Sequence, residues 1–169
     1  MAYYKIQREE MVDLLERFGL ERVTFEGTSE MVYTFTPPKE GNTVSIYVYT
    51  SIDASRKAAR DKGEDAIRCI FVDSESGKPV GKTARIHRIH TWEKNLTNRL
   101  RTMVVMAPQI SKIKCKKCGC QTAYRSGKFG HFFGCLNYPE CDGTRNDNYA
   151  LLESQAVAFL KKKGKWVTR

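Results

Sequence analysis

Hydrophobic and polar positions follow both helical and strand periods in the first two thirds of the chain. In residues 6–18, apolar side chains recur every three or four positions and charged residues fill the other face, which predicts an amphipathic helix that ends at Gly19. In residues 43–51, apolar and polar positions alternate with period two, as in a half-buried strand. We expect further strands at residues 22–25, 31–35, 66–73 and 80–87, and a loop or short exposed helix at 52–65.

Two more helices are predicted in the second half. Thr91 is a candidate N-cap for a helix over residues 92–106, which Pro108 is expected to end. Residues 148–163 have an apolar side and a lysine-rich end, and we expect this helix to dock on the N-terminal sheet or on the cysteine-rich segment. The order of elements predicts an α+β fold: an N-terminal antiparallel sheet with flanking helices, then a small ribbon and a C-terminal helix.

Five of the six cysteines lie within residues 112–145 and form two close pairs. Cys115 and Cys118 have the spacing C-x2-C, Cys135 and Cys141 have C-x5-C, and sixteen residues separate the pairs. Two such pairs supply four thiolates for one structural Zn²⁺, with strands expected at 122–125 and 131–134. No leader segment is recognised, so we expect reduced cysteines rather than disulfides.

Two other side chains in this segment could bind the metal. Cys120 could replace Cys118, and His131 could in principle bind, although it lies in a predicted strand, away from both cysteine turns. We take Cys115, Cys118, Cys135 and Cys141 as the ligands, which leaves Cys120 as a free thiol.

The same segment resembles a known family. The runs CKKCG, YRSGKFGHFFGC and LNYPEC, within residues 115–144, are similar to the C-terminal zinc ribbons of bacterial type IA DNA topoisomerases. The resemblance implies binding of DNA, preferentially single-stranded, through the aromatic and basic faces of the ribbon. It does not imply topoisomerase activity, because that chemistry needs a catalytic tyrosine and an acidic metal-binding domain in a much longer body, which the other residues do not match.

Aromatic and basic side chains are the candidates for nucleic-acid contact, since bases stack on rings and phosphates pair with cations. Phe132 and Phe133 must face opposite ways in a strand, so only some of the aromatic residues can be exposed. The candidates are Lys114, Lys116, Lys117, Tyr124, Arg125, Lys128, Phe129, Phe133 and Tyr138 in the ribbon, and Lys82, Arg85 and Arg88 before it.

The charge distribution favours a polyanion as partner. The net charge is +10, yet residues 1–77 have ten basic against fourteen acidic side chains, 78–101 have seven against one, and 112–169 have twelve against four. Such asymmetry indicates a directed binding surface. No apolar run approaches the ~18–20 residues that span a bilayer, so we expect no membrane association and a soluble, cytoplasmic protein bound at an intracellular DNA site.

These observations predict three parts: an α+β domain of unassigned family (1–107), a topoisomerase-type C4 zinc ribbon (108–145) that begins with a short tether, and a basic helix and tail (146–169). The function expected is nucleic-acid binding in DNA replication, recombination or repair. The alternatives are a nuclease-like enzyme with its site in the N-terminal domain, or an RNA-binding or protein-bridging adaptor. No catalytic motif stands out, and residues 77–83 lack the glycine spacing and following helix of a phosphate-binding loop.

Overall fold

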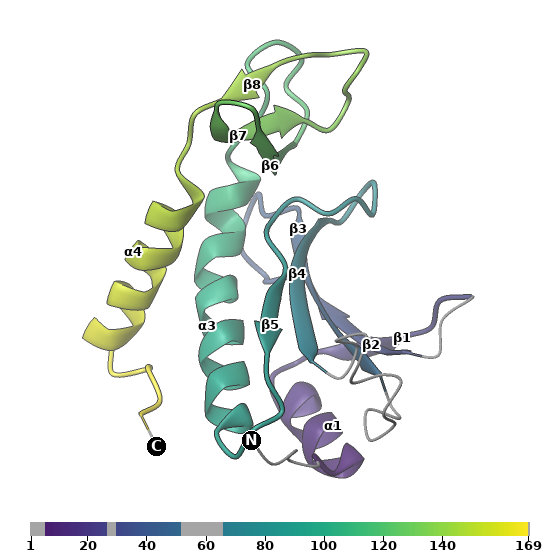
Figure 1. The fold of residues 1–169 in the computed structure, drawn as a ribbon, viewed down its shortest axis with the longest axis vertical. Coiled ribbons are helices and arrows are strands. Elements are labelled where there is room, and N and C mark those ends of the chain that lie inside the picture. The colour runs from purple at the N-terminus through teal and green to yellow at the C-terminus, as the bar shows by residue number, and fades with distance from the viewer. Residues whose placement is uncertain (1–5, 27–29, 52–65, 169) are drawn as a thin grey trace.

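The computed structural model describes residues 6–26, 30–51 and 66–168. The expected loop or helix at 52–65 lies outside these ranges. The described residues form two antiparallel sheets and three helices, and Figure 1 shows the smaller sheet above the larger one. The elements, in chain order, are α1 (Arg8–Arg17), β1 (Glu21–Val23), β2 (Glu30–Phe35), β3 (Val44–Ser51), β4 (Ile67–Asp73), β5 (Ala84–Ile86), α3 (Trp92–Ser111), β6 (Thr122–Gly127), β7 (Gly130–Cys135), β8 (Thr144–Arg145) and α4 (Tyr149–Lys162).

The larger sheet has the strand order β1-β2-β3-β4-β5, with every neighbouring pair antiparallel. The alternating pattern of β3 sets its register, because Val48 lies opposite Tyr33 on β2 and Cys69 on β4, and all three are buried. Helix α3 covers this face of the sheet, and α1 lies near the first turns of α3 (Figure 1). The predicted α+β architecture, an antiparallel sheet with flanking helices followed by a small ribbon and a C-terminal helix, is confirmed.

Helix α3 is longer than predicted. It runs through Pro108 to Ser111, although proline lacks the N–H that would bond to the carbonyl four residues earlier. Tertiary contacts hold the last turn in place: Ile110 is fully buried, and the Ser111 hydroxyl accepts from the backbone N–H of Thr43 at 3.0 Å. The expectation that Pro108 ends the helix is therefore wrong. None of the helices in the described ranges is long and apolar enough to cross a membrane.

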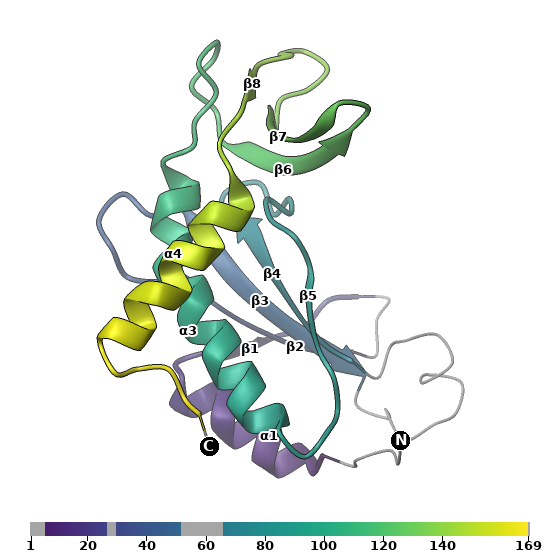
Figure 2. The same cartoon turned by 60° about the vertical axis from the view of Figure 1, so that its left-hand side comes forward.

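Helix α4 packs along α3 rather than on the sheet, and the two lie side by side in both Figure 1 and Figure 2. Arg99 of α3 forms an ion pair with Glu153 of α4 at 2.8 Å. Helix α3 is therefore covered on two sides, which explains why the polar residues Asn98 and Thr102 are buried as well as its apolar stripe. The sequence predicted the apolar side of α4, but it did not indicate that this side would pack on α3.

The joint between α3 and the ribbon is held by buried hydrogen bonds. The Gln121 amide donates to the carbonyl of Ile110 at 3.0 Å, and the Thr122 hydroxyl donates to the carbonyl of Ile113 at 2.5 Å. On the other side of the ribbon, the backbone N–H of Tyr124 donates to the carbonyl of Val80 at 3.0 Å. The segment expected to be a tether is thus fixed, and residues of all three predicted parts share one core cluster. The division into three parts stays a prediction.

Candidate zinc centre and nucleic-acid interface

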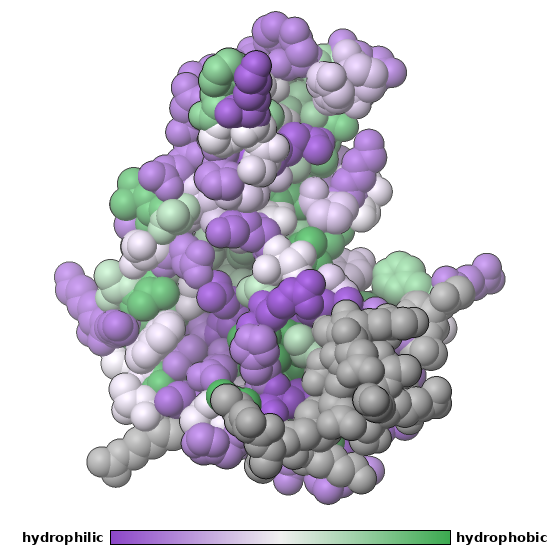
Figure 3. Space-filling model, viewed as in Figure 1, coloured by the Kyte–Doolittle hydropathy of each residue, from purple (hydrophilic) through white to green (hydrophobic). Residues whose placement is uncertain are grey.

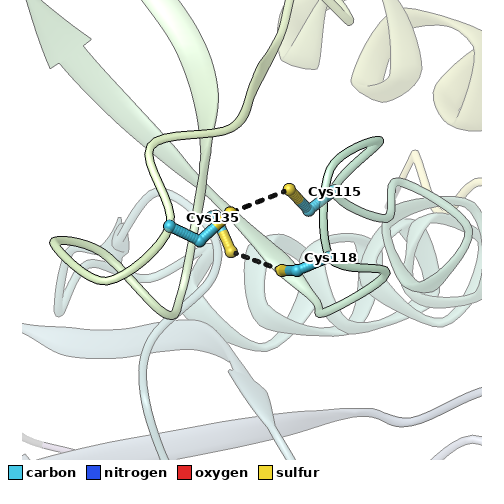
Figure 4. A group of neighbouring side chains, drawn as sticks. Cys115, Cys118 and Cys135 are labelled. Atoms are coloured by element: carbon cyan, nitrogen blue, oxygen red, sulfur yellow. Dashed lines mark hydrogen bonds between the residues drawn. The ribbon is translucent and has the colours of Figure 1, made fainter.

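Four cysteines meet between two loops of the ribbon. Cys115 and Cys118 come from the turn that follows α3, Cys135 ends β7, and Cys141 lies in the next loop. Figure 4 shows the side chains of Cys115 and Cys118 pointing across toward Cys135. The four Sγ atoms lie within 4.8 Å of one another, with Cys115 to Cys141 at 3.6 Å and Cys118 to Cys135 at 3.3 Å.

This geometry fits a tetrahedral zinc ion. A Zn–S bond of about 2.3 Å places the sulfur atoms of a tetrahedral site about 3.8 Å apart, close to the separations observed. The pKa of Cys115 is lowered to about 6, mainly because its sulfur accepts a hydrogen bond from the backbone N–H of Cys118. Burial raises the pKa of Cys135 to about 12. Thiolates this close together need a cation to stay ionised, and zinc supplies it. The four cysteines form a structural zinc site.

Gly143 is a residue of the site that sequence reasoning missed. A Cβ atom at this position would lie 2.2 Å from the Sγ of Cys115 and 3.6 Å from the Sγ of Cys141. The Gly143 carbonyl also accepts from the backbone N–H of Cys135 at 2.9 Å, which closes the loop that carries Cys135 and Cys141. Its position two residues after Cys141 was the available signal, since glycine often allows close approach of backbone to a bound group.

The two alternative ligands lie outside the cluster. Cys120 is an exposed free thiol, and its backbone carbonyl accepts from the N–H of Cys115 at 2.8 Å. His131 is exposed, and its ring stacks on Tyr124 at a centroid distance of 5.2 Å. The remaining cysteine, Cys69, is fully buried in the larger sheet, and burial raises its pKa to about 12, as expected for an unreactive core thiol.

The candidate aromatic residues divide into exposed and buried ones. Phe129 at the β6–β7 turn is 97% exposed and Tyr138 in the following loop is 68% exposed. Phe133 is 0% exposed, because its ring packs against both Tyr124 and Tyr149 of α4. In this position Phe133 cannot stack on a base, which corrects the expectation from the sequence. Tyr124 is half-buried in the same cluster.

A pocket opens on the other face of the ribbon hairpin. Its volume is about 320 Å³, and its lining includes Arg125, Phe132, Gly134, Tyr138 and Thr144. A Cβ at Gly134 would lie 3.1 Å from the Arg125 side chain and 3.2 Å from the Phe132 ring, so both flat groups lie close over this glycine. The pocket therefore combines aromatic rings, the guanidinium group of Arg125 and the hydroxyl-bearing Thr144. Its lining also includes Asp142, whose carboxylate is paired with Lys117.

The candidate basic residues are placed in different ways. Lys116, Arg125 and Lys128 are exposed on the ribbon, and Lys82 and Arg85 are exposed before it. Three others have partners within the protein: Lys117 pairs with Asp142 at 2.6 Å, Lys114 donates to Gln121 at 3.0 Å, and Arg88 donates to the Thr50 hydroxyl at 2.9 Å.

Comparison with known proteins agrees with this geometry. Residues 112–149 match the model of the family described as topoisomerase DNA-binding C4 zinc finger. DNA topoisomerase 1 of Campylobacter jejuni is 38% identical over 48 residues, which are 27% of this chain and 7% of that enzyme. An uncharacterised protein of Escherichia coli, YrdD, is 55% identical over 31 residues, 18% of this chain and 17% of that protein.

The matches are local, since the chain spans less than a fifth of the length of either relative. No solved structure matches the chain. Residues 112–149 are thus a topoisomerase-type zinc ribbon, a module with a nucleic-acid-binding role, and the α+β part of the chain that precedes it is not described by these matches.

Proposed function

We propose that the protein binds single-stranded DNA through its zinc ribbon and acts as a DNA-binding or accessory factor in replication, recombination or repair. The observation that carries this proposal is the exposure of two aromatic rings of the ribbon, Phe129 and Tyr138, each with a basic side chain nearby: Lys128 beside Phe129, and Arg125 in the pocket with Tyr138. Nonspecific single-strand binding combines stacking platforms with cations that follow the backbone.

The arrangement favours unpaired bases over a duplex. A ring that is almost fully exposed can stack on the face of a base that is free of its partner strand, whereas in a duplex it must first unstack neighbouring base pairs. The pocket beside Tyr138 is large enough to hold a flat ring against Phe132 or Arg125, with the Thr144 hydroxyl near its edge. Zinc contributes by fixing the two loops that flank this surface, because the ribbon itself has little apolar core.

The phosphate contacts would make binding depend on salt. Each lysine or arginine that neutralises a phosphate on a single strand contributes a log–log slope near −0.7. We expect Lys128→Ala to flatten the slope by about that amount, whereas Phe129→Ala should weaken binding with little change in slope.

Fluorescence anisotropy with the zinc-loaded full chain tests the proposal. Labelled single-stranded DNA, duplex DNA and single-stranded RNA of equal length are titrated at low and moderate salt. Phe25→Ala is the matched control, because Phe25 is also an exposed phenylalanine but follows β1, at the far edge of the larger sheet. Preferential binding of single-stranded DNA that Phe129→Ala weakens and Phe25→Ala does not is the expected result. Stronger binding of RNA than of single-stranded DNA would indicate an RNA-binding protein. Absence of binding to all three probes would refute the proposal.

A further inference from the structure

A groove crosses α3 between the chain that follows β5 and the C-terminal tail. Its volume is about 280 Å³, and its walls include Arg85 and His87 on one side, Asn95 and Arg99 on the helix, and Trp166 on the other side. None of these residues belongs to the ribbon. Much of the face over α3 is hydrophilic, with hydrophobic residues in separate small patches (Figure 3).

The tail is fixed on α3 by hydrogen bonds, so the tryptophan wall is a built feature. The side chain of Asn98, which is buried, donates to the carbonyl of Val167 and accepts from its N–H, both at 2.8 Å. Arg101 donates to the carbonyl of Lys165 at 2.5 Å. These bonds hold Trp166, between the two anchored residues, at the edge of the groove. The ammonium group of Lys161 lies 5.4 Å from its ring centroid.

The charges around the groove suit a phosphodiester backbone. Arg85 and His87 are exposed. The acidic side chain on the neighbouring part of α4, Glu153, is already paired with Arg99 at 2.8 Å. A half-buried tryptophan beside cations has the chemistry of a single-strand site, in which a base stacks on the ring and the phosphates meet the basic wall.

The groove is connected to the ribbon by one continuous stretch of chain. The Lys82 ammonium group lies 5.8 Å from the Tyr124 ring centroid of the ribbon, and the Lys82 backbone bonds to the Tyr149 hydroxyl. From Lys82 the chain runs down beside α3 through β5, as Figure 2 shows, and reaches His87 within about 17 Å at ~3.3 Å per residue. Two basic side chains, Lys82 beside the ribbon and Arg85 in the groove, therefore lie along this stretch.

We propose that this groove is a second nucleic-acid site, which holds the part of a single strand that extends beyond the ribbon. Arg85 and Lys82 contact its phosphates and Trp166 stacks on one base. The inference rests on the proposed function of the ribbon and gives the N-terminal domain a role in binding. It predicts that strand length matters: a short strand occupies the ribbon alone, and a longer strand occupies both sites.

Intrinsic fluorescence gives a direct readout, because the chain has only two tryptophans and Trp92 is 2% exposed. Single strands of about six and about twenty nucleotides are titrated into the zinc-loaded full chain. Quenching that occurs with the longer strand and disappears in Trp166→Phe is the expected result. Unchanged emission of Trp166 while the longer strand binds would overturn the groove assignment.

Charge variants provide the second measurement. Lys82→Ala with Arg85→Ala should weaken binding of the longer strand roughly tenfold at low salt and flatten its slope by about 1.4, with little effect on the short strand. The matched control is Arg22→Ala with Lys39→Ala, which removes an exposed arginine on edge strand β1 and an exposed lysine in the β2–β3 loop, neither of which lines the groove. Equal losses in the two double variants, or equal losses with both strand lengths, would refute the groove. If Phe129→Ala weakens binding and the variant with Lys82→Ala and Arg85→Ala does not, the groove is refuted and the ribbon is not. If the wild-type chain binds neither strand, both proposals are refuted.

Discussion

Phe129 and Phe133 lie four residues apart in the same hairpin, and the structure gives them opposite roles. Phe129 is almost fully exposed and its ring lies near the Lys128 ammonium group at 5.7 Å. Phe133 is fully buried against Tyr124 and Tyr149. We predict that Phe133→Ala destabilises the protein and that Phe129→Ala affects only nucleic-acid binding.

The magnitudes follow from burial. Removing a buried phenylalanine ring costs about 3–5 kcal/mol, because apolar surface is lost from the core and a cavity remains. For a chain of this length, 1 kcal/mol shifts the Tm by about 2–4 °C, so Phe133→Ala should lower it by about 6–20 °C. An exposed side chain such as Phe129 contributes within about 0.5 kcal/mol to folding. Its loss should weaken single-strand binding by about 1–3 kcal/mol, or roughly 5–150-fold in Kd.

Thermal unfolding and anisotropy are measured on both variants at equal zinc content. Zinc is assayed in each sample, since a variant that lost its metal would confuse the two effects. Binding is measured well below the lower Tm, so that the ribbon is folded in both proteins.

Two outcomes would contradict the reasoning. If Phe133→Ala has the same Tm as the wild type, the Phe133 ring does not stabilise the contact between the ribbon and α4, and the ribbon is not part of the common core. If Phe129→Ala binds single strands as tightly as the wild type while Phe133→Ala does not, the stacking surface lies on the face of the hairpin that carries Tyr124 and Phe133.

Three further predictions follow from other contacts. Gly143→Ala should weaken zinc binding in a chelator competition, because its Cβ would lie 2.2 Å from the Cys115 sulfur; unchanged affinity would show that the loop adapts. Gly81→Ala should cost about 1–3 kcal/mol in urea unfolding, since its Cβ would lie 2.7 Å from the Phe71 ring and 3.1 Å from the Tyr149 hydroxyl. Burial raises the pKa of Tyr149 to about 12, so above pH 10 the unfolded state releases this proton while the folded state keeps it, and stability should fall by up to about 2–3 kcal/mol toward pH 12. Tyr149→Phe should remove that part of the pH dependence, and an identical profile in both proteins would contradict the assignment.

Local pattern was sufficient for the elements and for the metal. Period-two alternation in β3, the spacing of the four cysteines and the start of α3 at Trp92 each depend on near neighbours in the chain, and the structure has all three where the sequence predicted them. The family resemblance of residues 115–144 has the same origin, because a zinc ribbon is specified by a short run of residues.

Only the tertiary structure decided how these elements meet. The sequence predicted a helix end at Pro108, but contacts of Ile110 and Ser111 with the sheet stabilise one more turn. It placed Phe133 among possible stacking residues, but α4 returns and covers that face of the ribbon with Tyr149. It left two roles open for the C-terminal lysines with Trp166, complementing the helix dipole or extending a nucleic-acid track, whereas the hydrogen bonds of Asn98 place Trp166 in a groove with Arg85. Each of these outcomes depends on residues distant in the chain, and the free energy of such contacts is absent from any local pattern.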